Sequence, residues 1–127
     1  MGQQQLLLIV LGVIVVGIAV VVGINLFNAN ATAANRDGVI SDLNNLSAMA
    51  QQFYKKPTSM GGGGNTFTSW TIPTGLDSTA NGTYAATPSA STVSIVGTGY
   101  ETGDDGSSPV QATATVNSNT ISVAVNN

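Results

Sequence analysis

Acidic side chains near Glu101 are the first candidates for chemistry in this sequence. Glu101, Asp104 and Asp105 fall close together in a glycine-rich stretch. Carboxylate oxygens are ligands that Ca²⁺ prefers, so the three residues are weak candidates for a calcium site. A full calcium cage needs about six to eight oxygens at set positions, more than this stretch offers. We therefore expect a solvated turn here and no bound metal.

Other catalytic groups are scarce. The chain has no histidine and no cysteine. The usual general bases, activated nucleophiles and zinc or iron ligand sets depend on these side chains, so only carboxylates, lysines and hydroxyl groups remain. We expect no catalytic residues and no enzymatic activity.

Two glycine clusters are candidates for cofactor-binding loops. Gly97-Thr98-Gly99, followed by Gly103, lacks the spacing of a dinucleotide-binding motif, so a turn is predicted there. The four glycines Gly61–Gly64 lack the Lys and Ser/Thr of a phosphate-binding loop. We interpret residues 57–65 as a flexible connector, and no cofactor is expected.

Three aromatic residues and one tripeptide leave a secreted sugar-binding domain as an alternative. Ala31-Thr32-Ala33 is a fair small-x-small cleavage site, and cleavage near Ala33 would release a soluble β-domain. Trp70, Tyr84 and Tyr100 would then stack on sugar rings, although aromatic residues of this kind are more often part of a core. Against a signal peptide, the first five residues carry no basic side chain.

Asparagine-linked modification is a weak possibility. Asn30, Asn45 and Asn81 each begin an acceptor tripeptide, in a chain rich in Asn, Ser and Thr. Chance explains each match, but Asn81 is expected in a loop where a glycan would fit.

Composition limits the size of the fold and the class of partner. The chain has 127 residues and, apart from its apolar N-terminal stretch, can form one small domain. Three Lys plus Arg and six Asp plus Glu give a formal net charge of −3. Because a basic surface for phosphates is absent, we expect no nucleic acid contact by the isolated subunit.

Leu6–Ile24 is the stretch on which the rest of the chain depends. It contains no charged residue, amide, hydroxyl or proline. Its nineteen residues would form a helix of roughly 28 Å, which matches the hydrocarbon thickness of a bilayer. Every face of this helix is apolar, so lipid or other apolar helices must surround it.

The helix is predicted to continue as an amphipathic segment. Val39, Leu43, Leu46, Ala50 and Phe53 follow alternating spacings of four and three, with Ile40, Met49 and Tyr54 widening the stripe. The polar side chains are expected to face elsewhere: Asp42, Asn44, Asn45, Ser47 and Gln51. Lys55-Lys56 before Pro57 predicts the end of the helix near Lys56. A helix from about Gln3 to Lys56 would measure roughly 80 Å.

The C-terminal half has β-sheet chemistry, with four or five strands predicted. Residues 110–116 and 121–125 alternate apolar and polar side chains around Asn117-Ser118-Asn119, the pattern of a β-hairpin. Residues 92–96 are a further strand, and 67–72 and 83–86 are weaker candidates. The fold class is α+β: a long N-terminal α-helix packed on a small antiparallel β-sheet head, with the 39–54 stripe as cover.

An apolar N-terminal segment, its amphipathic continuation and a small β head resemble the type IV pilin family, including archaeal pilin and archaellin relatives. The sequence resemblance rests on residues 1–27. It implies processing by a dedicated peptidase after a glycine: either Gly2 precedes the cut and Gln3 begins the mature chain, or Met1 is itself the mature start. The Glu usual near the mature start is replaced by Gln5 or Leu7, according to the register. Val22 lies at or near the place of the usual proline.

The resemblance implies that subunits wait in the membrane and are then extracted so that their helices bundle into a filament core. The implied polymer interface is apolar: Leu6, Leu7, Leu8, Ile9, Val10, Leu11, Val13, Ile14, Val16, Ile18, Val20, Val21, Ile24 and Phe27. Partners would be further copies of the chain, the membrane before assembly, and the pilus assembly machinery.

The sequence therefore predicts a structural subunit, a major pilin, of a type IV pilus-like surface filament. The subunit is expected in the cytoplasmic (inner) membrane before assembly and in an extracellular filament afterwards; adhesion, motility or DNA uptake would be properties of the polymer. The predicted parts are an apolar helix (1–27), an amphipathic helix (28–56), a linker (57–65) and a β-rich head (66–127). A single-pass anchored binding domain that never polymerises is the main alternative.

Overall fold

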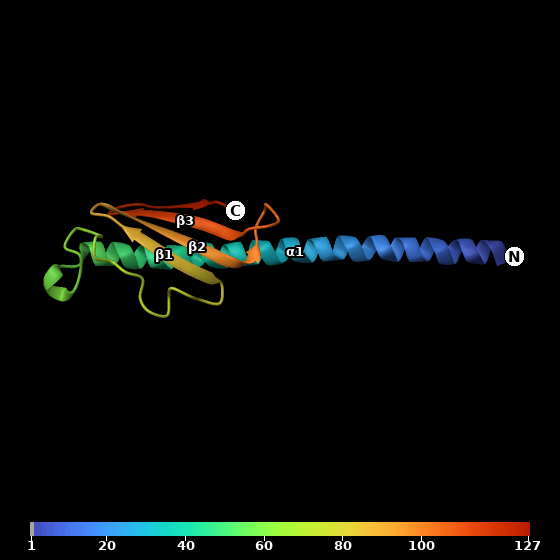
Figure 1. The fold of residues 1–127 in the computed structure, drawn as a ribbon, viewed down its shortest axis with the longest axis horizontal. Coiled ribbons are helices and arrows are strands. Elements are labelled where there is room, and N and C mark those ends of the chain that lie inside the picture. The colour runs from blue at the N-terminus through green and yellow to red at the C-terminus, as the bar shows by residue number, and fades with distance from the viewer. Residues whose placement is uncertain (1) are drawn as a thin grey trace. The chain divides into compact units, whose positions relative to one another are not determined.

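The computed structural model describes residues 2–127, which form one long helix, one short 3₁₀-helix and one sheet (Figure 1). The elements in chain order are α1 (Gly2–Lys55), η1 (Thr58–Met60), β1 (Gly82–Pro88), β2 (Thr92–Thr102), β3 (Pro109–Asn117) and β4 (Ile121–Val125). The fold class is α+β, as predicted. Two separate units divide the chain: the residues before Thr32, and Thr32–Asn127, which is called the head here.

The helix ends at Lys55, one residue before the predicted position. Pro57 cannot continue it, since proline lacks the backbone N–H that the next turn needs. The following segment then turns back on the helix end. The N–H groups of Gly63, Gly64 and Asn65 donate to the carbonyls of Phe53, Lys56 and Tyr54 at 2.8, 3.0 and 2.8 Å.

The segment predicted to be a flexible connector is thus an ordered cap for α1. Its hydrogen bonds satisfy carbonyls that a helix end leaves without partners. Glycine is needed because a Cβ at Gly62 would lie 2.3 Å from the Lys56 carbonyl oxygen, and one at Gly63 would lie 2.0 Å from that of Thr66. The run of glycines indicated freedom in the sequence, whereas the fold uses the small volume of glycine.

The four strands form an antiparallel meander in the order β1-β2-β3-β4. The predicted hairpin is confirmed as β3 and β4, with Val116 opposite Ile121 and Ala114 opposite Val123. Its turn is held by Asn117, whose Oδ1 accepts from the N–H groups of Asn119 at 3.0 Å and Thr120 at 2.6 Å.

One strand prediction and one turn prediction were wrong. Residues 67–72 form no strand; Phe67 and Trp70 instead insert from an irregular segment into the core. The turn predicted at Gly97-Thr98-Gly99 is also absent, because these residues continue β2. A Cβ at Gly97 would lie 2.9 Å from Val39 Cγ1, and one at Gly99 would lie 2.0 Å from Asn35 Oδ1, so both glycines serve close packing of α1 on the sheet.

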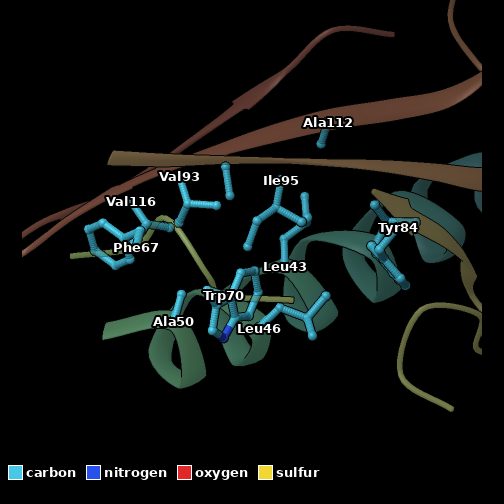
Figure 2. Close-up of a cluster of buried hydrophobic side chains, with 12 residues drawn as sticks. Leu43, Leu46, Ala50, Phe67, Trp70, Tyr84, Val93, Ile95, Ala112 and Val116 are labelled. Carbon is cyan, nitrogen blue, oxygen red and sulfur yellow. The ribbon is translucent and has the colours of Figure 1, made fainter. Parts of the chain in front are cut away.

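The core lies between the second half of α1 and the inner face of the sheet, as Figure 2 shows. The predicted stripe is confirmed: Val39, Leu43, Leu46 and Ala50 are buried, and Ile40, Met49, Phe53 and Tyr54 are partly buried around them. Each large apolar side chain buried in this way contributes about 1.5 to 3 kcal/mol. The other buried members come from the sheet and the segment before it: Phe67, Trp70, Tyr84, Val93, Ile95, Ala112, Ala114 and Val116.

Three polar residues of α1 were predicted to face away from this core, and they do not. Ser47 is fully buried, where its hydroxyl donates to the Leu43 carbonyl at 2.6 Å. Gln51 reaches the Asn117 carbonyl of β3 at 3.2 Å. Asp42 accepts hydrogen bonds from the segment before β1 and from β1 itself. Polar side chains that have hydrogen-bond partners, whether on the same helix or on other segments, can therefore share a helix face with apolar ones.

Candidate functional site

The first half of α1 exposes an apolar surface that runs around the helix. Of the residues predicted for the polymer interface, the least exposed is Ile14 at 53% and the most exposed is Phe27 at 75%. Three further residues, absent from the predicted interface, are between 50% and 61% exposed: Val15, Val22 and Leu26. Their position in the same uncharged run was the signal that should have included them. This surface is the candidate functional site.

Its lack of burial distinguishes this segment from the core helix of a soluble protein. Its length and composition are sufficient to cross a membrane, and none of its most apolar window is buried by the rest of the described chain. Leaving this apolar surface in water is unfavourable, because burying apolar surface contributes about 25 cal/mol of free energy for each Å². An N-terminal signal sequence shares these properties, so the segment indicates membrane association or secretion.

Three glycines lie in the same segment, and no other part of the described chain packs against them. A Cβ added at Gly12, Gly17 or Gly23 would have no atom within 4 Å. Their contacts within the described chain therefore do not require glycine. Small residues let two helix backbones approach closely, so these positions are suited to contact with another molecule.

The predicted processing residues Gly2 and Gln3 lie in the first turn of α1, and both are exposed. The first turn holds no acidic residue, and Gln5 is exposed there as well. Met1, the alternative mature start, lies outside the described residues.

The three acidic candidates for calcium binding, Glu101, Asp104 and Asp105, do not converge on one point, and Asp104 and Asp105 have different partners. Among residues 2–127, no group of three acidic side chains is placed to hold a metal. Asp104 pairs with Arg36, with Nη2 and Oδ1 2.9 Å apart. Asp105 Oδ1 accepts from the N–H groups of Ser107 and Ser108 at 2.9 and 2.8 Å, and these bonds hold the pKa of Asp105 well below its usual range. Glu101 is exposed at the end of β2.

Asp42 forms a polar cluster that the sequence did not reveal. Its Oδ2 accepts from Tyr84 Oη at 2.6 Å, Thr79 Oγ1 at 2.8 Å and Asn81 Nδ2 at 3.1 Å. Burial alone would raise the pKa of Asp42, but the three hydrogen bonds outweigh it and lower the pKa. Burial and the bond to Asp42 raise the pKa of Tyr84. The cluster fixes the segment before β1 to α1 and has no open reactive group.

The three aromatic candidates for sugar binding, Trp70, Tyr84 and Tyr100, do not form a common stacking surface. Trp70 and Tyr84 are only 4% and 6% exposed, while Tyr100 is 61% exposed at the end of β2. The side-chain nitrogen of Asn81, which would carry a glycan, is bonded to Asp42. Asn81 is therefore not the open loop amide that the sequence indicated.

An open groove lies beside the end of α1. It encloses about 420 Å³ and is lined by Met49, Phe53, Lys56 and Trp70 among others. Lys56 is its one charged side chain, and no acidic residue or other titrating partner joins it. A single ammonium on an open surface provides neither a general acid–base pair nor a nucleophile with its base.

Comparison with family models, curated proteins and solved structures gave no match. The architecture itself is pilin-like. A long N-terminal helix begins with an apolar segment, and its second half packs on a four-stranded antiparallel sheet.

Proposed function

We propose that this chain is the structural subunit, a major pilin, of a type IV pilus-like surface filament. The observation that carries the proposal is the uncharged helix segment 6–27, whose large side chains are all at least half exposed. In this proposal the segment rests in the membrane before assembly and bundles with copies of itself in the filament core.

The division of the chain supports a subunit that changes its surroundings without refolding. The core of the head draws its buried side chains from residues 39–116, so none comes from the apolar segment. Extraction of that segment from lipid into a helix bundle would replace one apolar environment by another. The head would stay folded throughout.

The chemistry of the segment also suits close packing between copies. Leu6–Ile24 has no ionisable side chain, so no unpaired charge would be repeated in every subunit of the core. Branched Val and Ile side chains dominate it and have few rotamers to lose. We propose no catalytic role for the subunit, and further copies, the membrane and an assembly machinery as its partners.

A charge in the middle of the segment tests the proposal. Val16→Asp would cost about 2.5 to 3.5 kcal/mol at a membrane centre by insertion scales, and the unpaired carboxylate would recur in every subunit of a filament core. We expect filament yield in sheared surface fractions to fall much further than the subunit level in membranes. The readouts are electron microscopy of the sheared material and subunit quantification in both fractions.

The matched control is Val16→Leu, which keeps apolarity but changes side-chain shape. A lipid anchor would tolerate this change, whereas an interdigitated helix core would lose some packing, so we expect a smaller filament defect. If the unmodified chain is abundant in membranes but forms no filament, an anchored binding domain becomes the better account. A mass measurement showing cleavage near Ala33 would indicate a secreted domain instead.

A further inference from the structure

The inner face of the sheet is only partly covered within the head, because its β4 edge is left exposed. A helix is about 10 Å wide and strands lie about 4.8 Å apart, so one helix covers roughly two strands. Here α1 is supplemented by Phe67 and Trp70, and together they bury the inner faces of β2 and β3. The fourth strand extends beyond them.

The uncovered part is defined here as the β4 ledge: Ile121, Val123 and Val125. These residues pair with Val116, Ala114 and Ala112, all of which are fully buried on the inner face. The ledge therefore has the same orientation as the core. Val123 packs partly against the core, but Ile121 is 37% and Val125 49% exposed. Apolar side chains thus continue the core surface out into solvent.

The two edges of the sheet differ in protection. Edge strands are usually shielded by charge, proline or a covering segment, because an open edge attracts other chains. β1 contains Pro88 and is bordered by the Tyr84 N–H to Asp77 carbonyl bond. β4 has the sequence Ile-Ser-Val-Ala-Val, with neither charge nor proline, and no strand pairs with its outer side among residues 2–127.

We propose that the β4 ledge receives the apolar segment 6–27 of α1 from a second copy of this chain. A second helix beside α1 would complete the layer that one helix leaves unfinished, and it must be apolar on the side that meets the ledge. The second half of α1 is unsuited, because its exposed side carries Asn44, Asn45 and Gln52. Segment 6–27 is uncharged, helical and exposed. The inference rests on the proposed function and assigns the surface of the head that contacts a neighbouring subunit.

Cysteine cross-linking tests the contact directly, since the natural chain has no cysteine. Two full-length subunits would be co-expressed, one carrying Val125→Cys and the other a single cysteine at Leu8, Leu11, Val15, Ile18 or Val22. Treatment with a short bismaleimide should give a mixed dimer for at least one pair. The matched control is Ala124→Cys, which lies on the same strand but points to the opposite, exposed face. We expect no mixed dimer from the control.

A charge substitution supplies the second readout. Val125→Asp should lower filament yield by at least about tenfold, because a carboxylate without a partner is costly in an apolar contact. Ala124→Asp should leave the yield near that of the unmodified chain. Equal effects of the two variants would contradict the proposal.

The outcomes separate this inference from the proposed function. Filaments without any mixed dimer from Val125→Cys would overturn the ledge contact and leave the filament intact. Dimers between two Val125→Cys subunits, with no helix partner, would also overturn it and indicate pairing of β4 with itself. Mixed dimers in membranes of cells that form no filament would support the contact and overturn the filament. Absence of both dimers and filaments would overturn both.

Discussion

Asp42 illustrates how one residue can connect segments that are distant in sequence. Three donors from Thr79, Asn81 and Tyr84 converge on one oxygen of its carboxylate. Hydrogen bonds to a charged group are worth about 1.5 to 3 kcal/mol, more than those between neutral groups. Because the residues between Phe67 and β1 form no strand apart from one bridge at Ser78, this cluster is a main tie between that segment and α1.

The head should therefore lose stability in acid. The pKa of Asp42 is lowered on folding, so its contribution is complete above the pKa of the unfolded chain and is lost as pH falls through the lower, folded value. Asp105 acts in the same direction. We expect the melting temperature of a head fragment, Asn30–Asn127, to fall below about pH 4, where unfolded carboxylates become protonated. Thermal unfolding followed by circular dichroism across this range is the measurement.

Replacement of the carboxylate isolates the Asp42 share of that effect. Asp42→Asn should cost about 1 to 3 kcal/mol near pH 7 and less in acid, where the natural side chain is also neutral. Asp37→Asn, at an exposed position on the same helix, is the control and should change little. A constant difference between Asp42→Asn and the unmodified fragment at every pH would show that charge is not the cause.

At the scale of elements, regular periodicity was predictable and irregular packing was not. The spacing of Val39, Leu43, Leu46 and Ala50 identified the buried helix face, and strict alternation identified the β3–β4 hairpin. Gly97 was misjudged because a glycine favours turns locally. Its actual role, to let Val39 approach β2, depends on a contact between residues far apart in the chain.

The same limit applies to the segment that holds Phe67 and Trp70. Aromatic and β-branched residues predicted a strand there, since their propensities fit a pleated surface. The fold instead uses the two rings to fill the core from an irregular segment, and Phe67 lies 4.7 Å from Tyr54 between ring centroids. Tertiary packing outweighed local propensity, and sequence pattern alone contains no information on that packing.

Truncation of a buried side chain in the helix stripe should lower the stability of the head. Leu46 is 2% exposed within the core, so Leu46→Ala should destabilise the head by about 2 to 5 kcal/mol through lost burial and a residual cavity. Asn45 is its exposed neighbour, and Asn45→Ala should change stability by less than about 0.5 kcal/mol. Denaturant unfolding of the head fragment measures both. Similar losses for the two variants would contradict the helical phase seen in the structure.

At the scale of the whole molecule, the sequence indicated the apolar segment but not the surface that would meet it. An uncharged run of nineteen residues is visible without a structure. The β4 ledge was hidden, because Ile121, Val123 and Val125 alternate like any buried strand. Only the positions of α1 and the neighbouring strands show that Ile121 and Val125 lack a cover.

Because the buried core lies entirely within the head, we predict that the head folds without the apolar segment. The fragment Asn30–Asn127 keeps every member of the buried core and the bond from Thr32 Oγ1 to the Thr102 carbonyl. It should be soluble and show mixed helix and sheet by circular dichroism, with one cooperative thermal transition. A spectrum dominated by unordered chain would contradict the packing of α1 on the sheet.

Its state of association carries the sharper information. The fragment exposes the β4 ledge but lacks segment 6–27, the partner proposed for that ledge, so sedimentation should show a monomer. A stable dimer that Val125→Asp abolishes and Ala124→Asp does not would mean that the ledge binds another head. Addition of a detergent-solubilised peptide covering residues 6–27 should shift the backbone amide resonances of β4 more than those of β1, since β1 already has a covering segment on its outer side.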